Sequence, residues 1–279
     1  MGWSARCMVG VVLLVGGCGR LGFDPSNGVG SDGDFVFDDA GGGGDGGGGG
    51  GGGDGGGMSG ADAPGMTATE GLIAHFPLDS VTAQGSPSVV GSLQAECESG
   101  CPTAIAGRIN GALFFDETVV LRVDETGTFQ TTSGFSATMW IYPSRATSST
   151  PVSKMFMQPG TNLNSWQVEL TGSLDVGATT ADAAGDKAVD TTGVEAPLDT
   201  WTHVAITWDG TTLRQYVNGT SELSVARSVA FDGGDLMIGG DENDGSPDST
   251  YFFNGRIDDV RIYDRRLTDG EIAALAAGT

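Results

Sequence analysis

The chain has 279 residues, of which 49 are glycine, 36 are Asp or Glu and only 13 are Lys or Arg, so its formal net charge is −23. Basic patches supply most of the affinity for nucleic acid, and clustered Lys and Arg residues attract proteins to anionic lipid. This charge balance therefore argues against nucleic acid as a partner and against electrostatic docking on a membrane surface.

Residues 1–17 have the pattern of a secretory signal peptide. One positive charge, Arg6, precedes an apolar run over residues 8–15 that is far too short to span a bilayer. The VGGC segment that ends at Cys18 resembles a bacterial lipobox, in which the cysteine thiol takes the lipid. We therefore expect a lipoprotein anchored through Cys18, and Gly19 after it resembles the outer-membrane sorting pattern of Gram-negative bacteria. The alternative is an ordinary signal peptide with an incidental cysteine.

The composition of residues 18–69 predicts an acidic, glycine-rich tether. Within residues 41–57 only Asp45 and Asp54 interrupt the glycines. Such a segment has almost no apolar area to offset its ordering entropy, so we expect it to be disordered. A collagen-like helix is excluded because the stretch has no Gly-x-y period with proline.

Residues 70–279 are expected to form the folded domain. Short apolar runs recur between Gly, Asp, Ser and Asn clusters, which favours an all-β, two-sheet antiparallel jelly-roll sandwich. The expected strands are Leu72–Leu78, Ala112–Phe115, Val119–Val123, Phe135–Tyr142, Val152–Met157, Trp166–Leu170, Trp201–Trp208, Thr212–Val217, Leu236–Ile238, Tyr251–Phe253 and Arg256–Tyr263. The expected core anchors are Phe114, Trp140, Trp166, Trp208 and Ile262. A capping box from Thr268 to Glu271 predicts one short C-terminal helix outside the sandwich.

The stretch WTHVAITWDGTTLRQYVNG, residues 201–219, predicts the central meander of this domain. At period two, Val204 and Ile206 share one face and Ala205 lies on the other, so both faces of the strand have apolar cover. The Asp-Gly and Asn-Gly pairs that follow supply tight turns between antiparallel strands.

Together with four further motifs, this stretch is similar to the laminin G-like domains of the concanavalin A-like lectin/glucanase superfamily. The further motifs are GLIAHFPLD at 71–79, GALFFD at 111–116, FSATMWI at 135–141 and GRIDDVRIY at 255–263. The resemblance covers roughly residues 70–277 and implies the concanavalin A-like jelly roll. It says much less about function, because one fold hosts many kinds of site.

Cys97 and Cys101 lie in the segment CESGC, and with Cys18 they are the cysteines that remain after export. In an oxidising compartment two such thiols are expected to pair. The disulfide would pin the Ser88–Thr103 loop. Metal binding by the two cysteines is the weaker alternative, because no further soft ligands accompany them.

The carboxylates do not show the pattern of a hydrolase. Glucanases of the superfamily carry two glutamates around an aspartate on one strand, spaced Glu-x-Asp-x-Glu or Glu-x-Asp-x-x-Glu, and neither spacing occurs. The acidic run at 241–244 lies in a Gly-flanked segment that holds carboxylates less rigidly than a strand. His203 has no nucleophile placed with it and is expected to satisfy backbone or side-chain partners. We therefore expect no enzymatic activity.

Strict alternation along the last strand places Asp258 on the same face as Val260 and Ile262, the expected core face. A buried carboxylate is costly unless it is paired or binds a cation, and calcium suits ligands that are all oxygen. Relatives in the superfamily bind a structural calcium, some through an aspartate of this strand, and Asp79 is expected nearby.

Other partners for Asp258 stay open. It can pair with Arg108 or Arg256, or accept backbone N–H bonds. The usual Asp-x-Ser-Gly-x-Gly turn of the family is missing after Asp79, where the chain instead enters the disulfide segment. That departure argues against a calcium site shared with the family.

Ligand-binding sites in this fold lie on a sheet face or on rim loops, so two polar loops are candidates. The candidate ligand-binding residues are Asn162 and Asn164 in the loop 157–165, and Asp241, Asn243 and Asp244 in the loop 239–251. We expect a lipid-anchored, extracytoplasmic module that recognises glycan or an envelope or extracellular protein without catalysis. The alternatives are an adhesion module without a sugar site and a divergent glycan hydrolase.

Overall fold

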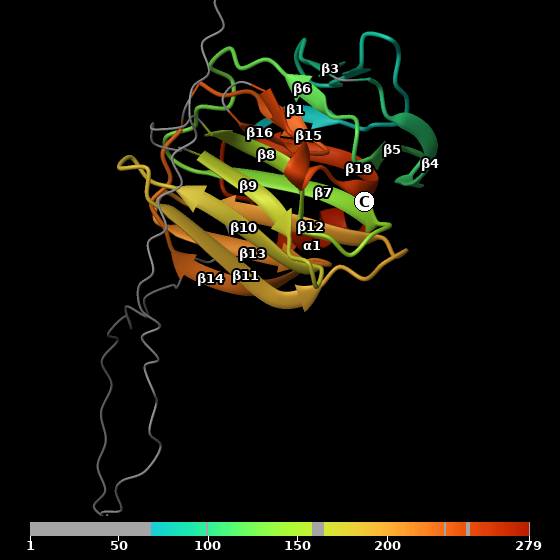
Figure 1. Ribbon diagram of the computed structural model, residues 1–279. Helices are drawn as coiled ribbons and strands as arrows, with labels where there is room; N and C mark the ends of the chain where they lie inside the picture. Colours follow the sequence, from blue (N-terminus) through green and yellow to red (C-terminus); the bar gives the residue numbers. More distant parts are fainter. Residues whose placement is uncertain (1–67, 99, 158–164, 232, 244–245, 279) are drawn as a thin grey trace, which may run out of the picture. The chain divides into compact units, whose positions relative to one another are not determined.

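The computed structural model describes residues 68–98, 100–157, 165–231, 233–243 and 246–278. These residues form two packed β-sheets, antiparallel apart from one short parallel pairing, and one C-terminal α-helix (Figure 1). The predicted all-β jelly-roll sandwich is therefore confirmed. Within the described ranges, no helix has the length and apolar character needed to cross a membrane.

The first sheet has eight strands in the order β14-β13-β12-β7-β18-β5-β4, with β1 also paired to β18. Its strands are β1 (Leu72–Phe76), β4 (Thr103–Ile109), β5 (Gly111–Asp116), β7 (Phe135–Pro143), β12 (Thr202–Trp208), β13 (Thr212–Val217), β14 (Thr220–Ala226) and β18 (Asn254–Tyr263). The predicted meander is β12, β13 and β14, and the turn between the last two has positive φ at both Asn218 (51°) and Gly219 (84°).

The second sheet has ten strands, eight of them in the order β11-β10-β9-β8-β15-β6-β3-β2, with β16 and β17 off this path. Its strands are β2 (Ser86–Pro87), β3 (Gln94–Cys97), β6 (Leu121–Val123), β8 (Ser149–Met157), β9 (Ser165–Leu170), β10 (Asp175–Ala181), β11 (Lys187–Glu195), β15 (Leu236–Ile238), β16 (Asp241–Asn243) and β17 (Ser246–Asp248). A 3-10 turn, η1 (Ser249–Tyr251), follows β17.

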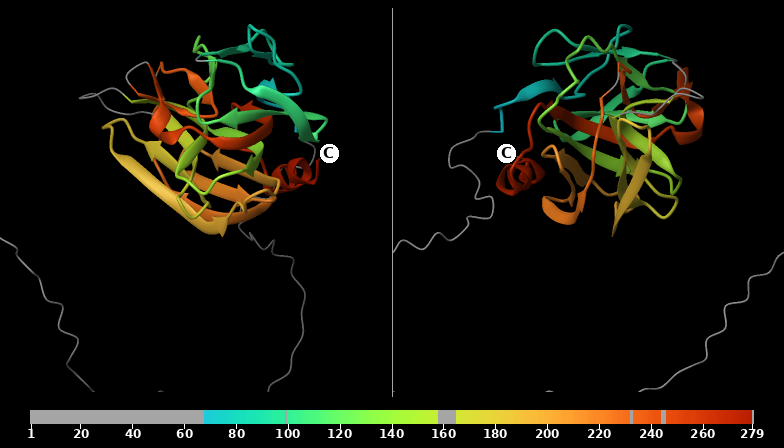
Figure 2. Two further views of the ribbon diagram at one scale, coloured as in Figure 1. Left: turned by 45° about the vertical axis from the view of Figure 1, so that its right-hand side comes forward. Right: turned by 90° about the vertical axis from the view of Figure 1, so that its left-hand side faces the viewer.

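The core lies between the two sheets, and alternation along each strand decides which side chains enter it. In β12, Val204 and Ile206 belong to the main core, whereas Ala205 faces the other side. There it packs with Ile272 and Leu275 of the helix α1 (Asp269–Ala277). Figure 2 shows α1 outside the sandwich. Apolar cover on both faces of β12 is therefore confirmed.

The helix begins and ends as its sequence predicts. Thr268 is the N-cap, and its side chain and that of Glu271 form the reciprocal capping box. At the other end Gly278 adopts the left-handed conformation and closes the helix.

Three expectations about the core are wrong in detail. Phe115 rather than Phe114 is fully buried, because the register of β5 directs Phe114 to the outer face. Trp140 is only 4% exposed but lies outside the main core, against His203. The segment 251–253 is not a strand, because Phe252 and Phe253 enter two separate apolar clusters from irregular backbone.

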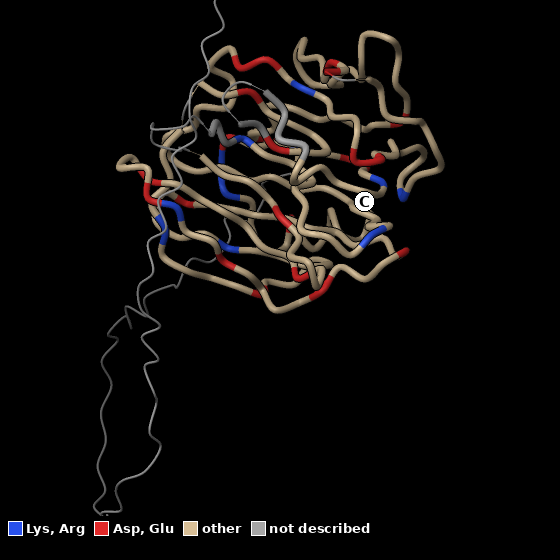
Figure 3. The backbone as a smooth tube through the Cα atoms, in the orientation of Figure 1, with Lys and Arg blue, Asp and Glu red and all other residues tan. Residues whose placement is uncertain are grey.

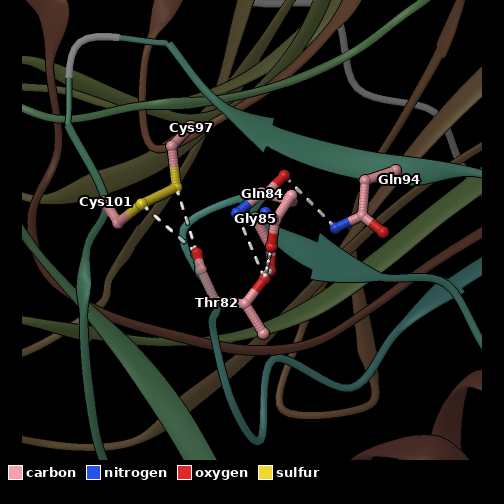
Figure 4. The surroundings of a disulfide bond; sticks show 6 residues. All are labelled: Thr82, Gln84, Gly85, Gln94, Cys97 and Cys101. Atoms are coloured by element: carbon pink, nitrogen blue, oxygen red, sulfur yellow. Dashed lines mark hydrogen bonds between the residues drawn. A yellow bond between two sulfur atoms is a disulfide. The ribbon is translucent and has the colours of Figure 1, made fainter.

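The predicted disulfide between Cys97 and Cys101 is present (Figure 4). It joins the end of β3 to the residues before β4, and both sulfur atoms lie close to the carbonyl oxygen of Thr82, at 3.8 and 3.4 Å. The bridge therefore fastens a short strand, rather than a loop without structure, beside the segment around Thr82.

Candidate functional site

A groove of about 290 Å³ lies on the outer face of the ten-stranded sheet. In β9, Trp166, Val168 and Leu170 enter the core, so the alternation of the strand directs Gln167 and Glu169 outward. The groove is lined by Ser148, Ser149, Thr150, Gln167, Glu169, Leu170, Thr171, Thr179, Lys187, Val189, Asp241 and Tyr251. It is thus built on β8 to β11, with one wall from β16 and η1.

Glu169 is the centre of a polar network in this groove. Its Oε2 atom accepts hydrogen bonds from Thr179 Oγ1 at 2.8 Å and from Gln167 Nε2 at 2.9 Å. The Oε1 atom of Gln167 is buried and has no hydrogen-bond partner. A buried acceptor without a donor costs free energy, so a hydroxyl or amide donor of a ligand would be stabilised there.

The rim of the groove adds apolar surface. Tyr251, from η1, is 41% exposed, and Val189, from β11, is 61% exposed. Most small-molecule sites combine such apolar and aromatic surface with a few placed polar groups. The groove has both components, and its charged side chains are Glu169, Asp241 and Lys187.

The predicted ligand-binding residues are only partly within the described chain. Asp241 lies in the groove and is 1% exposed. Asn243 lies in β16, whose backbone pairs with β8. Asn162, Asn164 and Asp244 lie outside the described residues.

Gln167, Glu169 and Thr179 were not predicted as site residues from the sequence. The signal is in the segment WQVEL, where two polar side chains alternate with three apolar ones. The alternation alone shows that Gln167 and Glu169 point outward from β9. Thr179, which donates a hydrogen bond to Glu169, comes from another strand, β10.

The second predicted site, Asp258 with Asp79, lies at the hairpin between β4 and β5. Asp258 is fully buried, and its Oδ2 atom accepts the backbone N–H groups of Arg108 and Ile109, both at 2.8 Å. Asp79 Oδ1 accepts the N–H of Gly111 at 2.8 Å. Of the alternatives for Asp258, backbone N–H donation is therefore the one observed.

The prediction that Asp258 faces the core with Val260 and Ile262 is wrong. The pairing of β18 with β7 shifts register between Asp258 and Arg261, and φ at Asp259 is +53°. This bulge inserts one extra residue, so Val260 and Ile262 keep their places in the core while Asp258 lies opposite Trp140 on the outer face.

The two aspartates of this bulge have opposite electrostatic surroundings. Burial raises the pKa of Asp258 to about 7, the charges of Asp259 and Asp79 add to this rise, and its two N–H donors oppose it. Burial also acts to raise the pKa of Asp259, but hydrogen bonds and charge from His75 and Arg261 bring that pKa below its ordinary value.

Asp258 Oδ1 is buried and has no hydrogen-bond partner, so one oxygen of this carboxyl remains for a cation. Within the described ranges, no group of three or more His, Cys, Asp or Glu side chains is placed to hold a metal. A cation held by Asp258 and Asp79 would therefore complete its coordination with backbone carbonyls or water.

His203 is buried beside Trp140, with ring centroids 5.2 Å apart. Burial lowers its pKa to about 4, so the ring is neutral at pH 7. Its Nδ1 atom has no hydrogen-bond partner, so the expectation that the ring satisfies its partners is not met at that atom.

Comparisons with known proteins agree with this architecture. The family model described as "Concanavalin A-like lectin/glucanases superfamily", of laminin G type, matches residues 116–273, which is more than half of the chain. A search of curated protein sequences found no match.

Solved structures with the same fold include the binding domain of Paraclostridial Mosquitocidal Protein 1, with a TM-score of 0.60 and 15% identity over 76% of this chain and 53% of that one. Domain 4 of AbnA, an extracellular arabinanase from Geobacillus stearothermophilus solved with arabinotriose, has a TM-score of 0.56 and 21% identity over 74% of this chain and 98% of that one. The binding domain of Botulinum Neurotoxin DC, solved with SialylT, has a TM-score of 0.56 and 14% identity over 76% of this chain and 52% of that one.

The chain spans about half the length of the toxin binding domains, and identities this low show a common fold alone. The fold and the family model nevertheless agree on one assignment. The chain belongs to the concanavalin A-like lectin/glucanases superfamily.

Proposed function

We propose that the folded domain is a non-catalytic module that binds neutral sugar residues in the groove on the ten-stranded sheet. The observation that carries this proposal is the unpartnered, buried Oε1 atom of Gln167 beside the fixed carboxylate of Glu169. A sugar hydroxyl can donate to these oxygens while the C–H face of the ring packs on Tyr251 and Val189.

The charges of the groove favour a neutral ligand over an acidic one. The groove is lined by two carboxylates, Glu169 and Asp241, and by one ammonium group, Lys187, and the whole chain has a net charge of −23. The solved domain of the arabinanase, which binds the neutral arabinotriose, supports this class of ligand by analogy of fold.

Binding without cleavage follows from how the carboxylates are held. Glycoside hydrolysis needs two carboxyl groups that both reach the scissile bond. Glu169 Oε2 is occupied by two donors and Asp241 is 1% exposed, so these two carboxylates, among the described residues that line the groove, do not form such a pair. Release of reducing sugar from the bound glycan, lost in a Glu169→Gln variant, would contradict this view.

Titration of the full chain with neutral oligosaccharides tests the proposal. Hydrogen bonds to a charged group contribute about 1.5–3 kcal/mol each, so Glu169→Gln is expected to weaken binding roughly 10- to 100-fold. Glu222→Gln is the matched control, because Glu222 is exposed on β14 of the other sheet. No binding of any glycan, with one stoichiometric envelope protein captured instead, would support the adhesion function.

We propose further that Asp258 and Asp79 hold a structural calcium ion. The free Oδ1 of Asp258 and the nearby charge of Asp79 support this, since a cation would offset both the burial, which is the main cause of the raised pKa of Asp258, and the smaller repulsion from Asp259 and Asp79. Calcium is expected to raise the melting temperature of the wild type and of Asp264→Asn, an exposed control, but not of Asp258→Asn. An equal response of all three would contradict the site.

We propose finally that Cys18 carries a lipid that anchors the chain at the outer membrane or cell surface. The VGGC segment after a short apolar run supports this. Metabolic labelling with palmitate is expected to mark the wild type and not Cys18→Ala. Labelling of both proteins, or of neither, would contradict the anchor.

A further inference from the structure

Two arginines differ from the other arginines of the described residues. Arg122, Arg145, Arg214, Arg227, Arg261, Arg265 and Arg266 each form an ion pair with a carboxylate. Within the same part of the chain, Arg108 and Arg256 have no ion pair or hydrogen bond from their guanidinium groups. This is unexpected in a chain with 36 acidic and 13 basic residues, where acidic positions outnumber basic ones along the fold (Figure 3).

Aromatic rings hold both guanidinium groups. Arg108 Cζ lies 4.7 Å from the ring centroid of Trp140, and Arg256 Cζ lies 4.5 Å from that of Tyr142. Trp140 and Tyr142 are two residues apart on β7, so they share its outer face, and their positions are separated by roughly 7 Å along the strand. Stacking fixes the plane of a guanidinium group and leaves its N–H edge for a planar oxyanion.

Aromatic rings also surround Arg256 and the ring of Tyr142 on which it lies. Trp201 packs edge-to-face on Tyr142 with centroids 5.4 Å apart, and Phe114 is the cross-strand neighbour of Arg256 on β5. All three rings are half-buried. Partial exclusion of water by these rings strengthens a charged contact relative to one on an open surface.

The carboxylate closest in register does not neutralise this pair. Asp258 lies opposite Trp140 on β18, but it is fully buried and directs its Oδ2 atom to the backbone of Arg108 and Ile109. The guanidinium edges therefore remain available to a ligand from outside.

We propose that this outer face of the eight-stranded sheet is a second binding site, which takes the carboxylate or sulfate groups of an acidic polysaccharide. Arg108 and Arg256 each donate to one oxyanion, and the half-buried rings of Trp201 and Phe114 pack on the C–H surface of the sugar. The pairing of cations with aromatic rings matches a ligand that has both negative groups and apolar faces. The site does not depend on the groove of the opposite sheet.

A polymer suits the site better than a small anion. The net negative charge of the chain opposes every anion, although salt at 0.15 M screens it beyond about 8 Å. A ligand that makes two charge-assisted contacts, each contributing about 1.5–3 kcal/mol, can overcome this field where a single contact would not.

The test uses the full chain and three probes: polygalacturonate for carboxylates, heparin for sulfates, and dextran as the neutral polymer. We expect at least one acidic polymer to bind, and Arg108→Gln/Arg256→Gln to weaken that binding at least 100-fold. Arg145→Gln is the matched control, because Arg145 is an exposed arginine whose charge is already paired with Glu117, and it is expected to bind as the wild type does. Glu169→Gln, altered in the groove, should also retain this binding.

Two results would overturn the second site. One is that neither acidic polymer binds, and the other is that the double variant binds them as tightly as the wild type. The melting temperature of each variant is measured as well. A purely structural role of the stacked arginines would lower the melting temperature of the double variant and leave the affinity of the folded protein unchanged. Arg108→Lys/Arg256→Lys keeps both charges but loses the planar edge, so we expect binding weakened about 5- to 20-fold.

Discussion

The two outer faces of the sandwich share one core and differ in what they present. On the ten-stranded sheet, the side chains around Glu169 line a groove that has a buried acceptor without a partner. On the eight-stranded sheet, α1 covers one part, and arginines stacked on aromatic rings form another. Inward positions must fill the core, so their chemistry is fixed, while outward positions can be specialised separately on each sheet. The difference predicts that core mutations affect both faces and outer-face mutations affect one.

The largest expected effect comes from the shared core. Trp166 is 1% exposed and stacks on Phe135 with centroids 5.1 Å apart. Trp166→Ala is expected to lower the free energy of unfolding by about 3–5 kcal/mol, because it leaves a cavity. Urea denaturation measures this, with the exposed Val189→Ala as control. A decrease in the free energy of unfolding below about 1 kcal/mol would mean that Trp166, on the strand under the groove, contributes little to the shared core.

Removing apolar contact under α1 is expected to have a smaller, one-sided effect. Ile272 is fully buried against Ala205 and Tyr216. Ile272→Ala should cost about 2–4 kcal/mol through the cavity it creates and leave glycan affinity in the groove unchanged. Denaturation and titration of the same sample test both parts, and Ala273→Ser, exposed on the same helix, is the control. A change in groove affinity would show that the two faces are coupled.

The buried carboxyl on the eight-stranded sheet predicts a dependence of stability on pH. The pKa of Asp258 in the folded chain is about 7, above its ordinary value of 3.8, so the folded state binds the proton more tightly. Stability should therefore fall as pH rises from about 4 to about 7 and then level off. In the presence of a chelator, the free energy of unfolding of the wild type is expected to fall by about 2–3 kcal/mol more than that of Asp258→Asn between pH 5 and pH 8.

Denaturation at the two pH values measures this difference, and Asp264→Asn, whose carboxylate is exposed, should behave as the wild type does. If the free energy of unfolding depended on pH equally in the wild type, Asp258→Asn and Asp264→Asn, the raised pKa of Asp258 would be contradicted. Added calcium should flatten the slope of the wild type if the ion binds at Asp258.

The smallest effect on stability is expected in the groove. Gln167→Leu removes the unpartnered acceptor but also the hydrogen bond to Glu169, so the change in stability should stay within about 1 kcal/mol. Sugar binding should nevertheless fall at least 10-fold. Retention of full affinity, measured by titration, would remove Gln167 from the site. Such a result would also mean that the unpartnered acceptor does not distinguish the ten-stranded sheet from the eight-stranded one as a sugar-binding face.

The sequence predicted much of the fold because strong local patterns agreed. The alternating strand 202–208, its Asp-Gly and Asn-Gly turns and the capping box at Thr268 all formed as expected. The third strand of the meander, β14, was expected after the Asn-Gly turn, but β4, β10 and β11 were not predicted, because their residues are small or polar and β4 and β11 lie at sheet edges with little apolar pattern. Each of these strands pairs with the strand next to it in the chain, and that hairpin partner, rather than an apolar pattern of its own, places it in the sheet.

The candidate sites were less predictable than the fold. Asp241 was expected in a ligand site and lies in the groove, but Gln167 and Glu169 become a site only where β10 brings Thr179 beside them. Asp258 was placed on the wrong face because a bulge shifts the alternation by one residue, and no pattern in GRIDDVRIY announces that shift.

The sequence by itself determined the class of fold, the order of its central strands, the helix cap and the cysteine pair, because turn chemistry and period-two alternation act over a few neighbouring residues. Only the tertiary structure decided which strands meet, and so which polar side chains share a groove and which arginines lie on the rings of β7. The contact between Glu169 and Thr179 joins two neighbouring strands, and the arginine–ring contacts join residues much further apart in the chain. The alternation within one strand carries no information about which side chains meet across strands.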